Sequence, residues 1–312
     1  MPALPLTMAI ATYGHTRALK DGTLQSERVV FKHAEVSPIT TAFRRMVRGL
    51  DYDIAEMALS TYLCARAYQK PITALPIFLL RRFEHGSIVY NVNSGLQSPL
   101  DLHGHRVGMR SYTLTPGVWV RGILQDAYGV DLQQVQSVLF GDEHVAEYVA
   151  PAHVVPAPAG SDIVAALRTG EIAAAIGVRA ADAPEIKPLI AEAHQAGMAY
   201  FKHTGVYPIS HLVVVKDELL QTYPWLAEEL FGLFKAAKDH YLGHLRAGTS
   251  QNPADQAMQA MRQAIGDDPL LYGVAPNRTT LETFIRFNVE QQVIPQPVTV
   301  EEIFPPSVLA LE

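Results

Sequence analysis

The sequence has 312 residues, a formal net charge of −6 and 48% hydrophobic residues, which is typical of a globular protein with one large or two ordinary domains. The acidic balance and the lack of a basic run argue against nucleic acid as the main partner. Cys64 is the only cysteine, which excludes disulfides, cysteine-rich zinc sites and iron–sulfur clusters within one chain.

The N-terminal segment MPALPLTMAIATYG has neither a basic start nor a long apolar region before a small-residue cleavage site. We therefore expect it to form the first strand of the fold and not a signal peptide. No stretch approaches the roughly 18 consecutive apolar residues of a membrane span. These features predict a cytoplasmic protein without a membrane partner, and they leave the formation of a homo-oligomer open.

Short apolar runs alternate with amphipathic ones along the chain, which predicts an α/β fold. The expected strands are Leu6–Ala11, Arg28–Lys32, Ile54–Met57, Ile72–Leu80, Ser87–Val92, Arg106–Gly108, Ser137–Phe140, Ala173–Gly177 and His211–Lys216. The expected helices include Thr40–Arg48, Ser60–Tyr68, Pro116–Tyr128, Ser161–Arg168, Pro224–Leu245, Pro253–Ala264 and Thr279–Glu290.

The C-terminal third is nearly all helical and must pack on a sheet formed earlier in the chain. This pattern predicts two lobes with a ligand cleft between them. Residues 1–92 and 206–312 would form the first lobe, and residues 93–205 would form the second. Two crossovers rich in Gly, Pro, Ser and Asn would join the lobes, near Asn91–Ser98 and Tyr200–Ser210.

Ligands of open α/β folds bind beyond the carboxyl ends of strands, beside helix N-termini. In DYDIAEMALSTYL, Glu56 ends a buried-looking strand and needs a partner, and Ser60 and Thr61 start a helix. Ser60 would cap that helix and leave N–H groups free for a carboxylate or phosphate, although an ordinary cap is the commoner meaning of such a serine.

A second helix start follows the strand at Arg106–Gly108. Arg110, Tyr112 and Thr113 precede it, so a cation and hydroxyls lie beside a helix N-terminus of the other lobe. Two further candidates come from strand ends: Arg179 follows the strand at Ala173–Gly177, and His211 opens the last strand. Taken together, these groups suit a small anionic ligand, most simply a carboxylate.

Known metal and nucleophile motifs are missing from the sequence, since it has no HExxH, EF-hand loop, P-loop or GxSxG pattern. His103 and His105 lie in a polar turn, where solvation is the simpler explanation. The sequence predicts no cofactor and leaves the need for a divalent metal open.

The segments DYDIAEMALSTYL, ALPIFLLRRFEHGSIVYN and DLHGHRVGMRSYTLTPGVWVRGILQDAYGV resemble the 4,5-dihydroxyphthalate decarboxylase family, as do YFKHTGVYPISHLVVV and DDPLLYGVAPNRTTLETF. The resemblance covers nearly the whole chain, from Thr12 to Ser307. It implies the two-lobed fold of type II periplasmic binding proteins, used for the decarboxylation of aromatic acids without an obvious organic cofactor.

With this resemblance, we expect decarboxylation of a hydroxylated aromatic dicarboxylate, with 4,5-dihydroxyphthalate as the lead substrate. His85 or His211 would donate the proton to the ring, and Glu56 would act as a base or orient a histidine. The carboxylate anchors and their helpers would be Arg82, Arg110, Arg179, the helix start at Ser60 and Thr61, and Tyr112 and Thr113 of the second lobe.

One position departs from the family pattern. Members carry arginine in an R-F-R-H-S segment where this chain has Glu84, within Arg82-Phe83-Glu84-His85-Gly86. A glutamate facing the cleft would weaken anion binding, but strand alternation places Glu84 on the face of Arg82, with which it would pair. The alternatives are a solute-binding protein of the same fold that does no chemistry, and an enzyme of this fold from pyrimidine or menaquinone synthesis.

Overall fold

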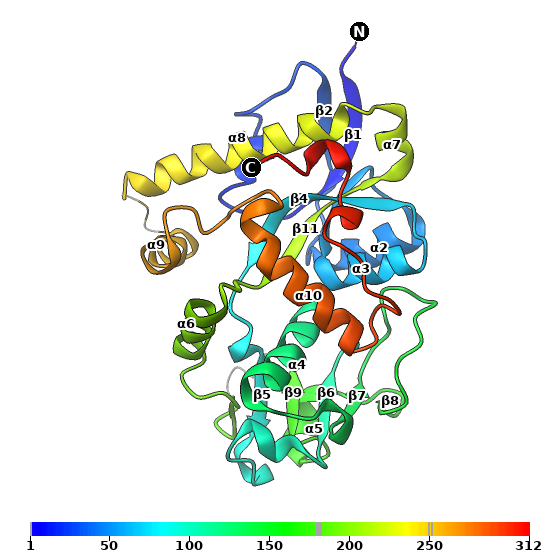
Figure 1. Ribbon diagram of the computed structural model, residues 1–312, viewed down its shortest axis with the longest axis vertical. Coiled ribbons are helices and arrows are strands. Elements are labelled where there is room, and N and C mark those ends of the chain that lie inside the picture. Colours follow the sequence, from blue (N-terminus) through cyan, green and yellow to red (C-terminus); the bar gives the residue numbers. More distant parts are fainter. Residues whose placement is uncertain (1, 179–182, 249, 251) are drawn as a thin grey trace.

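The computed structural model describes residues 2–178, 183–248, 250 and 252–312. Among these residues, two sheets form the cores of two lobes (Figure 1). The first sheet has the order β2-β1-β3-β11-β4, and the second has the order β10-β5-β9-β6-β7-β8. No helix in the described chain combines the length and apolarity that crossing a bilayer requires.

The first lobe contains both ends of the chain. Its sheet joins parallel strands β1, β2 and β3 to β11, which runs antiparallel to β3 and β4. The helices around it bury apolar faces against the strands, and α8 packs on β4 and α1. The elements are β1 (Leu4–Ala9), α1 (Arg17–Lys20), β2 (Val29–His33), α2 (Thr40–Gly49), β3 (Ile54–Ala58), α3 (Leu59–Ala67), β4 (Ile72–Arg81), β11 (Ile209–Lys216), α7 (Asp217–Thr222), α8 (Leu226–Arg246) and α9 (Pro253–Ile265).

The second lobe comes from the middle of the chain. Strands β9, β6, β7 and β8 run parallel, and β5 and β10 add an antiparallel edge. Its elements are β5 (Ile88–Asn91), β6 (Arg106–Met109), α4 (Thr115–Tyr128), β7 (Gln136–Leu139), β8 (Val154–Pro156), α5 (Ile163–Thr169), β9 (Ala174–Ile176), β10 (Ile186–Pro188) and α6 (Ala193–Thr204). Short 3₁₀ turns complete both lobes: η1 (His85–Ser87), η2 (Val92–Ser94), η3 (Pro99–Leu102), η4 (Leu132–Gln134), η5 (Ala275–Asn277), η6 (Glu301–Ile303) and η7 (Pro306–Val308).

The first crossover lies earlier than residues 91–98, where the sequence pattern placed it. Strand β5 pairs with β9 and β10 and therefore belongs to the second sheet, not to a lobe that extends to residue 92. The chain leaves β4 at Arg81, makes the turn η1 and enters the second lobe at once. The second crossover, between α6 and β11, falls within the predicted segment Tyr200–Ser210.

These two crossovers lie side by side. The Arg82 amide donates to the carbonyl of Pro208 (3.3 Å), and the Phe83 and Tyr207 rings pack with centroids 5.0 Å apart. The Glu84 carboxylate is fully buried between them, where Arg82 Nε (2.9 Å), Ser210 Oγ (3.0 Å) and Ser87 Oγ donate to it. The predicted pair of Arg82 and Glu84 is confirmed.

Helix α10 (Arg278–Glu290) connects the lobes on another side, as Figure 1 shows. It comes from the C-terminal segment but packs on α4 of the second lobe. Trp119 stacks on Phe284 with ring centroids 4.5 Å apart, and Gly122 of α4 lies directly under the Phe287 ring. The C-terminal helices thus cover the first lobe and also hold the second.

The contact at Gly122 predicts a stability effect. A methyl carbon at Gly122 would overlap the Phe287 ring, so Gly122→Ala should lower the free energy of unfolding by about 1–3 kcal/mol. Gly232→Ala in α8 is the matched control, because nothing lies within 4 Å of that position. Alanine should stabilise that helix by about 0.5–1 kcal/mol. Urea unfolding of both variants measures the difference, and equal stability would contradict the packing of α10 on α4.

Candidate active site

A cleft of about 640 Å³ lies between the two lobes. Groups from the start of α2, the ends of β3 and β4 and the start of β11 line it on the side of the first lobe. The second lobe contributes the segment from Met109 to Gly117, the loop after β7, the start of α5 and the end of β9. The cleft therefore lies at strand ends and helix starts of both lobes, where α/β folds bind ligands.

Three arginines give the cleft its positive charge: Arg44, Arg82 and Arg110. Arg82 is held by Glu84, yet 42% of its side chain is exposed, so it remains available to a ligand. Arg44 donates from Nη2 to the carbonyl of Asp142 (3.0 Å), and its buried Nε has no partner among the described residues. An unpaired buried donor at a cleft surface is costly unless a ligand or water accepts from it.

Helices α2 and α4 begin at the cleft wall, at Thr40 and Thr115. Their first N–H groups and the positive ends of their dipoles favour a bound anion. Asp142 and Asp162 also line the cleft, and Asp162 caps α5 by accepting from the Ala165 amide (2.8 Å). The arginines and helix starts thus predict binding of a ligand with more than one anionic group.

Glu56 and His211 form a pair across neighbouring strands β3 and β11. Glu56 is fully buried, and its Oε1 lies 2.6 Å from His211 Nδ1. Tyr13 Oη donates to the same oxygen (2.6 Å), and the Ala11 amide donates to Oε2 (2.9 Å). Burial alone would raise the pKa of Glu56, but these bonds and the charge of His211 outweigh it, so the pKa lies below its usual value.

His211 lines the cleft with 12% of its side chain exposed. Because Glu56 accepts at Nδ1, Nε2 is the ring nitrogen left for a ligand. The buried carboxylate fixes the tautomer and orientation of the ring, which is how a histidine is positioned for proton transfer. Glu56 is thus placed to orient His211, and it has no surface in the cleft itself.

A second histidine, His144, lines the cleft and was missed in the sequence. It follows Glu143 in the polar loop after β7, and its Nδ1 lies 2.9 Å from Thr61 Oγ1 of α3. The ring of Phe43 packs edge-on against both histidines, with centroid distances of 6.2 Å to His144 and 5.0 Å to His211. Only the packing of the lobes brings these residues together.

Four predicted binding residues support the cleft from behind. Ser60 is not the helix cap: α3 begins at Leu59 after Ala58, and the Ser60 hydroxyl donates to the Thr113 carbonyl of the second lobe. Thr61 contacts His144 and not the cleft space. Tyr112 and Thr113 are buried, and both amides donate to the Glu143 carboxylate (2.5 and 3.2 Å).

His85 lies apart from the cleft. The turn η1 carries its ring into the second lobe, where it is 1% exposed and edge-on to Tyr200 (5.5 Å). Burial lowers the pKa of His85 to about 4. The structure therefore does not support the predicted role of His85 as a proton donor, because the ring is buried and does not line the cleft. Arg179, the remaining predicted anchor, lies outside the described residues.

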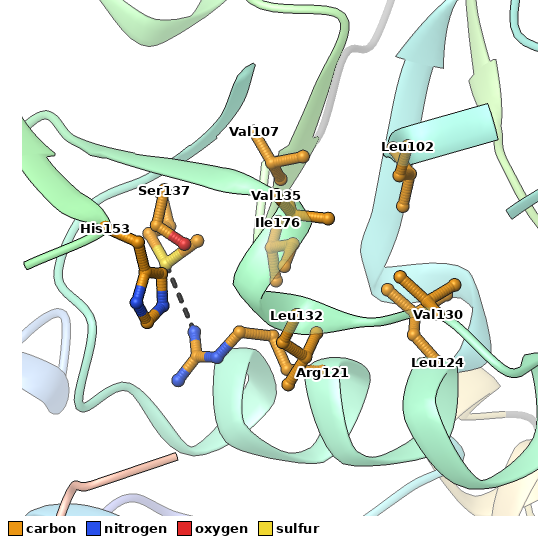
Figure 2. Close-up of a pocket in the computed structure, with 11 residues that line it drawn as sticks. Leu102, Val107, Arg121, Leu124, Val130, Leu132, Val135, Ser137, His153 and Ile176 are labelled. Atoms are coloured by element: carbon orange, nitrogen blue, oxygen red, sulfur yellow. Dashed lines mark hydrogen bonds between the residues drawn. The ribbon is translucent and has the colours of Figure 1, made fainter. Parts of the chain in front are cut away.

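A separate cavity inside the second lobe is too small for a substrate. Its volume is about 10 Å³, about that of one water, and its walls are mostly apolar (Figure 2). Arg121 of α4 reaches this cavity and donates to Met109 Sδ (3.2 Å), Gln291 Oε1 (2.8 Å) and the Tyr112 carbonyl (2.7 Å). These contacts give Arg121 a structural role between α4 and the segment after α10.

Within the described residues, no group of three or more His, Cys, Asp and Glu side chains is arranged to hold a metal ion. No protein-family model matches the chain. The 4,5-dihydroxyphthalate decarboxylase of Comamonas testosteroni is 30% identical over 328 residues, which span 99% of this chain and 98% of that protein. The chain belongs to the 4,5-dihydroxyphthalate decarboxylase family.

Solved structures confirm the fold that the sequence predicted for this decarboxylase-family chain. The periplasmic aliphatic sulphonate binding protein SsuA from Escherichia coli matches with a TM-score of 0.56 and 14% identity, over 99% of both chains. The desulfurization enzyme DSZB matches with a TM-score of 0.54 and 13% identity, over 98% of this chain and 97% of that one. The family thus has the two-lobed periplasmic-binding-protein type II fold, which serves both a binding protein and an enzyme.

The arginines predict how a small aromatic dicarboxylate binds. Phthalate, which lacks ring hydroxyls, serves as an unreactive probe in calorimetry. Arg44→Gln and Arg82→Gln should each raise its Kd by about 10- to 100-fold, because each removes one charge-assisted hydrogen bond. The control Arg246→Gln, on the exposed end of α8, should bind phthalate like the wild type.

Arg82→Gln also leaves the buried Glu84 without its cation, so thermal unfolding must accompany its titration. The double variant Arg82→Gln with Glu84→Gln removes that charge and should recover stability without recovering affinity. Unchanged phthalate affinity in both arginine variants would show that the cleft does not hold carboxylates through these residues.

Proposed function

We propose that this protein removes one carboxyl group from a hydroxylated aromatic dicarboxylate without oxidation. The lead case is 4,5-dihydroxyphthalate, which would give protocatechuate and carbon dioxide. The full-length relationship to a 4,5-dihydroxyphthalate decarboxylase carries the proposal. The cleft supports it because cations that suit a dicarboxylate lie beside a histidine oriented for proton transfer.

The substrate ring itself can accept the electrons that this reaction moves. When a ring hydroxyl para to the departing carboxylate loses its proton, electron density reaches the carbon that bears that carboxylate. This carbon then takes a proton, and the carbon–carbon bond to the carboxylate breaks. The protein must therefore supply a proton donor for the ring and an anchor for the retained carboxylate.

We assign His211 as the donor, through Nε2, with Glu56 as the group that orients it. Arg82, Arg44 and Arg110 would hold carboxylates, and the strongest clamp should lie on the retained one. A tight ion pair to the leaving carboxylate would stabilise the ground state and slow its loss as neutral carbon dioxide. Glu84 does not oppose this binding, because its carboxylate is buried behind Arg82 and does not line the cleft.

The likeness to a sulphonate binding protein favours one other function, which is binding of an anionic solute without chemistry. A panel of hydroxyphthalates separates the two. Carbon dioxide release is measured for each compound, and calorimetry measures its binding in the same buffer. We expect turnover of 4,5-dihydroxyphthalate and binding without turnover of phthalate. Tight binding of the whole panel with no carbon dioxide from any member would overturn the decarboxylase proposal and support solute binding.

A further inference from the structure

The reaction proposed above needs a proton acceptor for the ring hydroxyl as well as a donor for the ring carbon. His211 fills only the second role. His144 is the other imidazole in the described lining of the cleft. The surroundings of the two histidines differ in a way that suits His144 to act as a base and His211 as an acid.

His144 is held in place from the first lobe. Its Nδ1 is engaged with Thr61 Oγ1 (2.9 Å), and its backbone carbonyl accepts from Arg48 Nε (3.1 Å). Arg48 Nη2 also donates to the Glu143 carbonyl (2.8 Å), so this loop is fixed against α2. With Nδ1 engaged, Nε2 is the ring nitrogen of His144 that a ligand in the cleft can meet.

The charges around His144 favour its neutral form. Burial lowers the pKa of His144 to about 4, with help from the positive charges of Arg44 and Arg48 on α2. On α3 its partner is a hydroxyl, and the nearby Glu143 carboxylate is directed to the Tyr112 and Thr113 amides. His211 instead has the Glu56 carboxylate as its partner. Pairs of titratable groups in such contrasting environments mark acid and base roles in active sites.

We propose that His144 is a catalytic residue that accepts the proton of the substrate's ring hydroxyl, while His211 protonates the ring carbon. This assignment rests on the proposed decarboxylation. Phe43 packs edge-on against both imidazoles, so His144 from the second lobe and His211 from the first line the same part of the cleft. An aromatic ring bound beside them would present its hydroxyl to one histidine and its carboxylate-bearing carbon to the other.

Protons and electron pairs balance over the cycle. The hydroxyl proton moves to His144 Nε2, and the oxygen's electron pair moves into the ring. The para carbon forms a bond to the proton of His211 Nε2, which leaves His211 neutral. The bond to the carboxylate then breaks, its electron pair restores the aromatic ring, and carbon dioxide leaves. The oxygen recovers its proton from His144, and His211 takes one proton from water.

Arg44 acts on both groups that take part in this transfer. It lies beside His144 and lines the cleft, so its charge stabilises the phenolate oxygen as the proton departs. The same charge disfavours a proton on His144 in the empty cleft. A bound substrate dianion offsets that charge, and so raises the proton affinity of His144 once the substrate is in the cleft.

The test uses two substrates that differ in hydroxyl acidity, 4,5-dihydroxyphthalate and a ring-fluorinated analogue. The pH is chosen so that the ring hydroxyl of the analogue is ionised in solution and that of 4,5-dihydroxyphthalate is not. At this pH, kcat is measured for His144→Gln, His211→Gln and the wild type. Both variants should lose about 10²–10⁴-fold on the parent. On the analogue, the loss of kcat in His144→Gln relative to the wild type should be at least tenfold smaller than on the parent. The loss in His211→Gln should not shrink in this way. His244→Gln, at an exposed position of α8, is the control and should match the wild type on both substrates.

Glutamine at position 144 takes up no proton, and phthalate affinity reports whether the cleft is intact. His144→Asn repeats the comparison with a smaller side chain if glutamine disturbs the fold. Equal losses on both substrates, or no loss on the parent, would overturn the role of His144 and leave the decarboxylase proposal standing. A wild type that turns over neither substrate would overturn both.

Discussion

The Glu84 carboxylate lies fully buried where both crossovers pass between the lobes, and the geometry of the cleft depends on it. An ion in such a place is costly unless its partners are complete. Here the partners are Arg82 and Ser87 on one side and Ser210 at the start of β11. The hydrogen bonds that satisfy this charge connect the end of β4, the turn η1 and β11 at one point. This arrangement also fixes the guanidinium of Arg82 at the cleft surface, so Glu84 supports this cation of the cleft from beneath.

Glu56 of β3, the strand that pairs with β11, is stabilised in the same way. It is a second fully buried carboxylate with its donors supplied by Tyr13, the Ala11 amide and His211. In both cases a buried carboxylate accepts several hydrogen bonds, and one of its partners faces the cleft. That partner is Arg82 for Glu84 and His211 for Glu56. The cleft surface therefore carries arginines and imidazoles, while the negative charges that position them stay out of reach of an anionic substrate. This separation would let one site attract a dianion and still hold His211, the proposed proton donor, against a carboxylate.

Much of this arrangement was predictable from the sequence because it is local to strands. Glu56 interrupts an apolar strand, and His211 opens another, so each of these polar groups requires a partner once its strand is buried. Arg82 and Arg110 follow strand ends and do line the cleft. Arg44 and His144 gave no such signal, since one lies on an amphipathic helix and the other in the polar loop Gly141–His144. Only lobe packing makes them cleft residues. His85 is the opposite case. It is three residues from Arg82 in sequence, which suggested a place in the cleft, but the turn η1 carries it into the second lobe.

One event is central to the proposed reaction, the replacement of a ring carboxylate by a proton at the carbon that faces His211. Proton NMR of the reaction of 4,5-dihydroxyphthalate in deuterium oxide observes it directly. We predict protocatechuate with one deuterium, located at the carbon that lost the carboxylate, and one carbon dioxide for each molecule of product. Substrate that remains unchanged in the presence of the folded, phthalate-binding protein would contradict this mechanism.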